Sequence, residues 1–171
     1  IDRTTGTRDL RRLTGLRRRM PWVGMATVLA AASMAGIPPL LGYVAKESVF
    51  VALVDVAEYG DGTGLEGLTG WLLMLGVLLG SVLTVAYSIR FVWGAFADRE
   101  ITEELLDSKV PFGFGAGPVL LAFLGLGLGF AGTWLTAVFE PQVALFPEGV
   151  HDAELELWHG FGLPLLATVI A

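Results

Sequence analysis

Long apolar runs separated by short polar segments fill most of the chain. One run extends, with an interruption, from about residue 21 to Leu53, and two more cover Trp71 to Phe96 and Phe114 to Phe139. A helix that crosses a bilayer needs about 20 predominantly apolar residues, which the second and third runs supply. A further apolar run opens at Leu157. This pattern predicts several membrane crossings.

The polar segments between the apolar runs are predicted to be the loops that connect the transmembrane helices. We expect an all-α fold of multi-pass transmembrane helices, including one discontinuous helix, in a fragment of a larger membrane subunit. Between the second and third runs, Ile101, Leu105 and Leu106 recur at the spacing of an amphipathic helix lying on the membrane surface. The expected segments are a cytoplasmic basic loop (1–20), a broken transmembrane helix (21–57), an outer acidic loop (58–70), a transmembrane helix (71–97), a cytoplasmic loop with the amphipathic helix (98–113), a transmembrane helix (114–139), an outer acidic loop (140–156) and the start of a truncated transmembrane helix (157–171).

The first run is interrupted in the stretch Met34 to Ser48, which reads MAGIPPLLGYVAKES. Proline lacks a backbone donor and disfavours helical geometry in the residue before it, so the helix cannot continue through this stretch. Within a bilayer, such a break is tolerated only where protein or a water-filled cavity satisfies the freed backbone groups. The residues predicted to form the break are Gly36, Pro38, Pro39 and Gly42.

Composition supports a membrane protein and excludes several other classes. Only 16% of the 171 residues are charged, 54% are hydrophobic, and the mean hydropathy is +0.66, whereas about a quarter of a soluble domain is charged. The chain has no cysteine and two histidines, so thiolate sites and a histidine metal cluster are excluded, and no cofactor is expected. It starts with Ile and ends within an apolar run, as an internal piece of a longer protein would.

The distribution of basic residues favours one crossing over two for the interrupted first run. Seven of the eleven basic residues are arginines within the first nineteen positions, and no residue after Lys109 is basic, which argues against nucleic-acid binding. With one broken crossing, the arginine cluster falls on the same side as Arg90, Arg99 and Lys109. Cytoplasmic loops carry an excess of Lys and Arg. The basic loops are therefore predicted to be cytoplasmic and the acidic loops to face outward.

Lys46 is the main candidate for a functional residue. A lysine in such apolar surroundings is expected to have a function, because removal from water destabilises its charged form and allows proton exchange. The alternative is a lysine that snorkels to the outer interface. A straight helix would place it roughly 38 Å from Pro21, beyond a hydrocarbon core of about 30 Å, whereas a compact break would keep it inside. The residues alone leave both possibilities open.

Three other charged or titratable residues are candidates for supporting roles. Glu47 points about 100° round the helix from Lys46, so it either pairs with another segment or caps the outer end of the helix. Arg90 is near the cytoplasmic end of the second run, as an interfacial anchor or as the partner of a buried carboxylate. His159 begins the last run at the outer face, as an interfacial residue or as a proton entry group.

Glycines in the third run match the dinucleotide fingerprint GxGxxG at Gly127, Gly129 and Gly132. The match is rejected because no strand precedes it and no acidic residue follows at the required distance. The pairs Gly125/Gly129 and Gly76/Gly80 are instead typical of close helix packing in membranes.

Several of these motifs resemble a known family. Thr7-Arg8-Asp9-Leu10, Gly15-Leu16, Met20-Pro21, Ser33 to Pro39, Gly42 and Lys46-Glu47 are similar to the proton-pumping antiporter-like family. This family includes the A-type subunit of Mrp-type multisubunit Na+/H+ antiporters with its relatives there, and the large membrane-arm subunits of respiratory complex I. The stretches Tyr87 to Phe91 and Leu157 to Leu165 extend the resemblance, the latter toward the A-type subunit of the Mrp antiporters.

The resemblance implies a function and a set of partners. The matching segment of the family is a discontinuous helix whose lysine belongs to a chain of charged residues at the membrane midplane, a role that falls here on Lys46. We expect part of the A-type subunit of an Mrp-type Na+/H+ antiporter in the plasma membrane, with H+, Na+ or another monovalent cation, the lipid bilayer and other antiporter subunits as its partners. It would be a secondary transporter subunit, not an enzyme. The alternatives are a proton-pumping subunit of a respiratory NADH:quinone oxidoreductase and a structural subunit that transports nothing.

Overall fold

The computed structural model describes residues 2–13, 15–59, 67–97 and 111–143, together with residues 145 and 155. These residues contain helices and no strand, which confirms the all-α prediction for the part of the chain described. The helices are α1 (Asp2–Thr5), α2 (Leu16–Arg19), α3 (Pro21–Ala35), α4 (Leu41–Tyr59), α5 (Leu68–Phe96), α6 (Phe112–Gly129) and α7 (Gly132–Val143).

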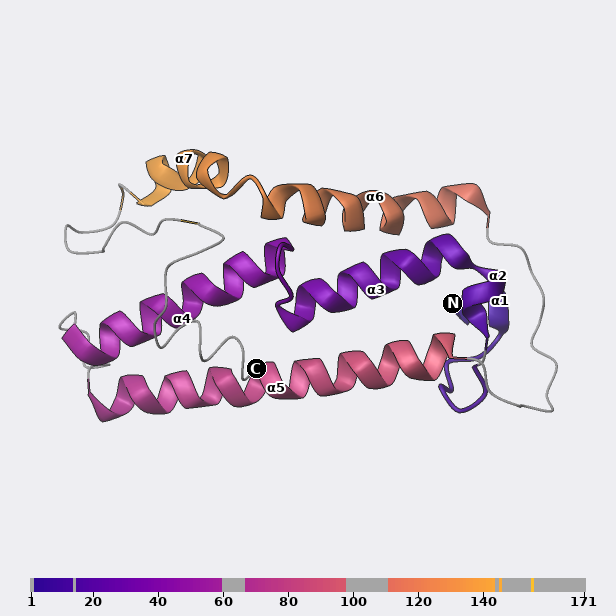
Figure 1. Cartoon of the computed structure of the whole chain (residues 1–171), viewed down its shortest axis with the longest axis horizontal. Helices are drawn as coiled ribbons and strands as arrows, with labels where there is room; N and C mark the ends of the chain where they lie inside the picture. The colour runs from indigo at the N-terminus through magenta and orange to yellow at the C-terminus, as the bar shows by residue number, and fades with distance from the viewer. Residues whose placement is uncertain are drawn as a thin grey trace.

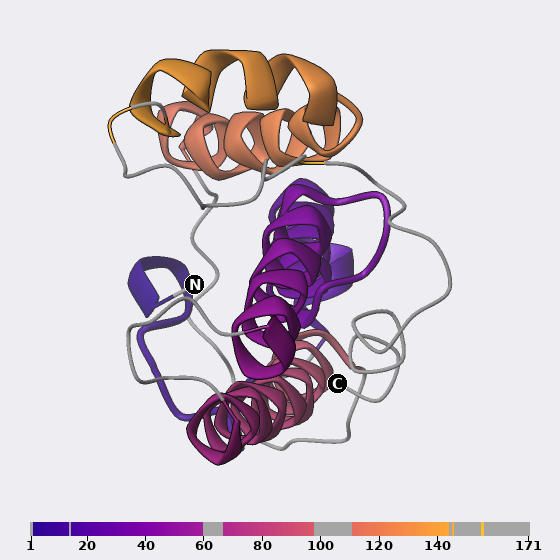
Figure 2. The same cartoon turned by 90° about the vertical axis from the view of Figure 1, so that its left-hand side faces the viewer.

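The helices α3 and α4 form the middle of the molecule and follow one another along its long axis (Figure 1). The single helix α5 runs antiparallel beside both of them, and α6 covers their other side (Figures 1 and 2). At one end of α5, the Gly67 amide donates to the Ala57 carbonyl at 3.1 Å. At the other end, the Phe96 ring packs against Gly24 in α3. Therefore α3 and α4 continue in one direction past the break.

Glycine and proline end α3 and delay the start of α4. Gly36 has a φ of 80°, in the left-handed region where a side chain is disfavoured, and its amide donates to the carbonyls of Ala32 and Ser33. The prolines Pro38 and Pro39 cannot donate to the preceding turn, and α4 begins only at Leu41. The discontinuous helix predicted from this stretch is confirmed.

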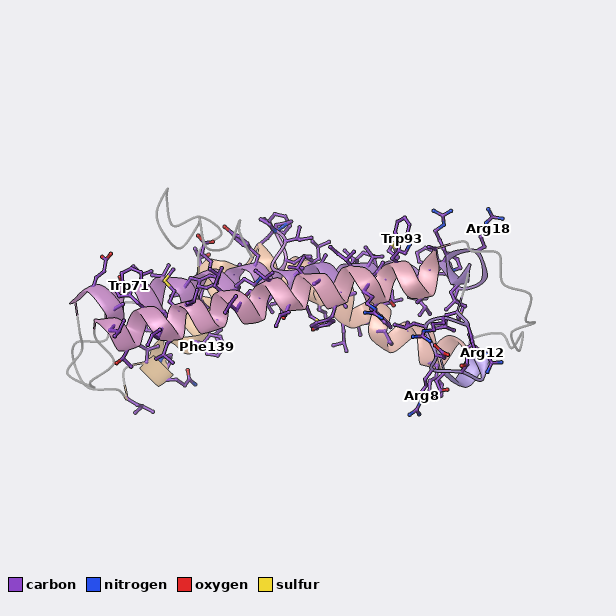
Figure 3. All side chains as sticks on the ribbon, turned by 90° about the horizontal axis from the view of Figure 1, so that it is seen from below. Arg8, Arg12, Arg18, Trp71, Trp93 and Phe139 are labelled. Atoms are coloured by element: carbon purple, nitrogen blue, oxygen red, sulfur yellow. The ribbon has the colours of Figure 1, made fainter. Side chains whose placement is uncertain are left out.

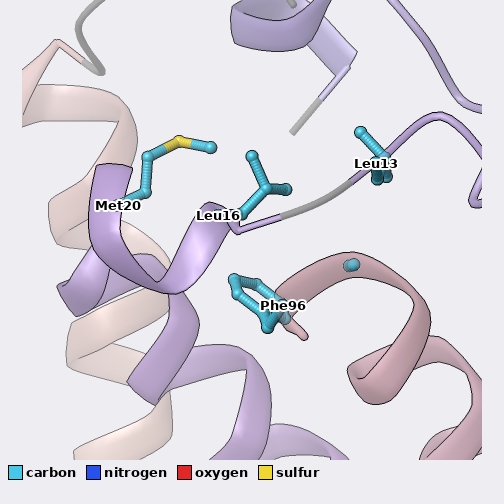
Figure 4. Close-up of a cluster of buried hydrophobic side chains, with 5 residues drawn as sticks. Leu13, Leu16, Met20 and Phe96 are labelled. Atoms are coloured by element: carbon cyan, nitrogen blue, oxygen red, sulfur yellow. The ribbon is translucent and has the colours of Figure 1, made fainter. Parts of the chain in front are cut away.

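A cluster of buried apolar side chains ties the start of α3 to the end of α5 (Figure 4). Leu13 and Leu16 are almost fully buried, and they pack with Met20 and Phe96. The Gly15 amide also donates to the Ala97 carbonyl at 3.1 Å. The arginine-rich segment is thus anchored through its apolar residues, and Arg8, Arg12 and Arg18 gather at this end of the molecule (Figure 3).

The third apolar run differs from the single helix expected over residues 114–139. It forms α6 and α7, which meet at an angle of 87°. The Phe130 amide folds back onto the carbonyls of Gly127 and Leu128, and this ends α6. Three glycines in this region (127, 129 and 132) lower the cost of leaving the helix.

The outer surface of the helices is strongly apolar. Of the described helices, α5 alone is long and apolar enough to cross a membrane by itself, and α6 and α7 qualify when they are taken together. Trp71 and Trp93 lie toward opposite ends of α5 (Figure 3), about 33 Å apart at 1.5 Å per residue. Since a hydrocarbon core is about 30 Å thick and tryptophan favours its two boundaries, α5 has the dimensions of a span.

Several predicted segments differ in their bounds or lie outside the described residues. Helix α4 extends to Tyr59 and α7 extends to Val143, so both helices enter segments expected to be acidic loops. The predicted amphipathic helix falls almost entirely on residues 98–110, outside the described part of the chain. The start of the last span (157–171) is also outside it.

Candidate ion-translocation site

The Lys46 side chain reaches back from α4 to the end of α3. Its Nζ donates a hydrogen bond to the Ala35 carbonyl at 2.7 Å. Carbonyl groups in the last turn of a helix have no partner within the helix and carry a partial negative charge. The amine therefore occupies a position at the break that favours a cation.

Gly36 leaves the space that the lysine side chain fills. A Cβ at this residue would lie 2.9 Å from Cε and 3.0 Å from Nζ of Lys46. Gly36 therefore has two functions in the break. It accepts the left-handed conformation that ends α3, and it allows the amine to approach the Ala35 carbonyl.

Ser33 joins the two halves of the broken helix from the α3 side. Its Oγ accepts a hydrogen bond from the Gly42 amide at 3.1 Å, which satisfies a donor in the first turn of α4. A Cβ on Gly42 would overlap the Ser33 carbonyl, so the two backbones meet only because residue 42 is glycine. Further bonds within the break run from the Ile37 amide to the Ala32 carbonyl at 3.0 Å and from the Leu40 amide to the Ile37 carbonyl at 3.1 Å.

These contacts place the Lys46 amine near the middle of the bundle. The helix α3 has 15 residues, so its last carbonyls lie about 21 Å from Pro21 along the helix axis. The lysine reaches back to this level, although its backbone lies further along α4. The straight-helix distance of roughly 38 Å from Pro21 therefore does not apply to the amine.

Glu47 lies on the buried face of α4 and not at the end of the helix. Its side chain has no exposed surface, as for Phe50 in the next turn. The Tyr43 phenol, one turn earlier, interacts with the Glu47 carboxylate. A carboxylate in such surroundings is costly to bury and needs compensating partners. This makes Glu47 a stronger candidate than its residue type alone indicated.

A sequence signal for the burial of Glu47 exists in the spacing of the residues around it. From Leu40 through α4, buried residues recur mostly at intervals of three and four, the period of a helix face packed against neighbours. Glu47 falls in the middle of this series, which consists of Leu40, Tyr43, Val44, Glu47, Phe50, Val54 and Ala57.

The remaining candidates are not brought to this site by the described residues. Arg90 is exposed on α5 and is not part of the ion pair that joins Arg8 to Asp2. His159 lies outside the described residues. The described part of the chain also contains no group of acidic residues and histidines able to hold a metal ion.

Comparisons with known proteins agree with the motifs around the break. Residues 1–60 match the family described as NADH:quinone oxidoreductase/Mrp antiporter, TM. Over 99% of its length, the chain is 33% identical to the Na(+)/H(+) antiporter subunit A1 of Staphylococcus aureus strains JH9, Mu3 and Newman. The chain spans 22% of the length of each of these relatives.

Proposed function

We propose that the chain belongs to the membrane family shared by NADH:quinone oxidoreductases and Mrp antiporters, and that the whole protein is the A-type subunit of a multisubunit antiporter exchanging Na+ for H+. The observation that carries this proposal is the Lys46 amine at the break, on the Ala35 carbonyl. An ionisable group inside a membrane is expensive to keep there, and such groups mark ion and proton pathways.

In the proposed mechanism, the Lys46 amine gains and loses a proton. The protonated amine is stabilised by the Ala35 carbonyl and by the negative end of the α3 dipole. When charges on helices outside this stretch rearrange, the amine passes its proton to the next group of the relay. The buried carboxylate of Glu47, adjacent in α4, modulates the local field.

The proposed topology is a single broken crossing made by α3 and α4. Its support is that both helices run in one direction beside α5 (Figure 1). The arginine-rich end would then be cytoplasmic, since basic residues favour that side. We place the subunit in the plasma membrane with the other antiporter subunits. There the relay would lie between the Na+ and H+ of the cytoplasm and those outside the cell.

The Lys46→Ala variant of the full-length subunit tests this function in membrane vesicles that contain the assembled complex. We expect Na+/H+ exchange to be lost and assembly to be retained, because the side chain donates one hydrogen bond and is only partly buried. The matched control is Arg90→Ala, which removes a positive charge from an exposed position on α5. Exchange in that control should stay within about twofold of wild type. Normal exchange in assembled Lys46→Ala complexes would refute the relay.

A second candidate function is a proton-pumping subunit of a respiratory NADH:quinone oxidoreductase, because the matched family includes both kinds of protein. The two functions differ in their driving force. Vesicles that acidify on addition of NADH, but show no Na+-dependent proton movement, would favour the respiratory complex.

A further inference from the structure

The end of α6 packs against the break between α3 and α4. A Cβ on Gly129 would overlap the Pro39 carbonyl oxygen and lie 2.9 Å from the carbonyl carbons of Pro39 and Leu40. All of these atoms belong to the backbone, so no side-chain rotation would relieve the overlap. The end of α6 and the backbone of the break approach this closely only because residue 129 is glycine.

This contact is specific to one glycine of α6. A Cβ on Gly125 or on Gly127 would meet nothing within 4 Å. Of the glycine pair Gly125/Gly129, Gly129 therefore makes the close contact between backbones, and it is the last residue of α6. Directly after Gly129 the chain turns by 87° into α7. The break is therefore contacted by the C-terminal end of α6 and not by the side of a continuous helix.

Pro39 and Leu40, which the end of α6 contacts, directly precede the first turn of the helix that carries Lys46. The Leu40 carbonyl accepts the Tyr43 amide at 2.9 Å in the first turn of α4. The next residue after Leu41 is Gly42, whose amide is held by the Ser33 hydroxyl. A displacement of Pro39 and Leu40 would move this turn, and with it the origin of the Lys46 side chain.

From these contacts we infer that Gly129 is a positioning residue for Lys46, and that the end of α6 holds the break in the geometry in which the amine meets the Ala35 carbonyl. The inference rests on the proposed function. It assigns to α6 a role in proton transfer, although α6 supplies no titratable side chain of its own within Phe112–Gly129.

The test compares Gly129→Ala with Gly125→Ala in the full-length subunit, assembled in its complex. Both variants make the same chemical change in the same helix, one turn apart. We expect Gly129→Ala to lower Na+/H+ exchange by about tenfold or more, since small displacements of reacting groups have effects of this size. Its pH dependence should shift as well, because the environment of the amine has changed. Gly125→Ala should stay within about twofold of wild type. Equal exchange and equal pH profiles in the two variants would overturn the inference.

A second measurement decides the case in which Gly129→Ala does not assemble. This stretch has no cysteine, so in a full-length subunit whose cysteines elsewhere have been replaced, the double variant Leu40→Cys with Phe130→Cys offers a single pair for a short bifunctional thiol reagent. If the end of α6 is a fixed support, the two residues link and exchange is preserved after linking. Absence of the link, or loss of exchange on linking, would overturn the inference. Failure of the proposed function is distinct, because the wild-type complex would then show no exchange in either experiment.

Discussion

Two helix breaks within the described residues, one between α3 and α4 and the other between α6 and α7, differ in how their backbone groups are satisfied. Between α3 and α4 the helices keep one direction, and the side chains of Ser33 and Lys46 reach across the gap. Between α6 and α7 the direction changes by 87°, and the amide of Phe130 folds back onto its own helix. A break alone therefore does not create a site for ions. What distinguishes the first break is a titratable side chain directed at the free end of a helix.

Within the first break, we expect substitution of Gly36 to reduce Na+/H+ exchange the most, because the Lys46 side chain packs against this residue. Gly36→Ala places a methyl group against the Lys46 side chain and a left-handed conformation on alanine, and the conformation alone costs about 1–2 kcal/mol. We expect Na+/H+ exchange in vesicles to fall by about tenfold or more, since the amine is displaced from the Ala35 carbonyl.

The control for this variant is Gly67→Ala. Gly67 also has a positive φ, of 65°, but a Cβ there would meet nothing within 4 Å. It therefore carries backbone strain without any contact to the lysine, and its exchange should stay close to wild type. Equal losses in the two variants would mean that strain, and not the position of the amine, limits exchange.

A smaller effect is expected at Ser33, which joins the two halves of the first break. Ser33→Ala removes the acceptor for the Gly42 amide, a hydrogen bond worth about 1 kcal/mol. Exchange should fall several-fold, and the complex should unfold at a slightly lower temperature. Ser48→Ala is the matched control, since the Ser48 hydroxyl donates to the Val44 carbonyl within its own helix, α4. An equal loss of exchange in Ser48→Ala would contradict the role of Ser33 in joining the two halves of the break.

The first break was predictable because its chemistry is local. Gly36, Pro38 and Pro39 are adjacent residues that end a helix whatever surrounds them, and a lone lysine in an apolar run is conspicuous. The resemblance to antiporter subunits rests on the same residues. The helical class and the discontinuous helix followed from this stretch and from the apolar runs.

The second break and the burial of Glu47 were not foreseen, because each depends on contacts between helices. The glycines from 125 to 132 suit a packed helix as well as a bent one, and the contact with the backbone of Pro39 and Leu40 distinguishes Gly129 from Gly125 and Gly127. The sequence was compatible with Glu47 capping the outer end of the helix, but the structure buries its side chain completely. Spacing indicates which residues share a face, but not what covers it.

The depth of the Lys46 amine in the bilayer decides between a proton-relay lysine and a lysine at the lipid interface. A structure of the full complex in lipid nanodiscs would measure the distance from Nζ to the planes of the lipid phosphates. We expect the amine on the Ala35 carbonyl, within the hydrocarbon core and about 21 Å from the level of Pro21. An amine lying among the headgroups would refute the proton relay at Lys46.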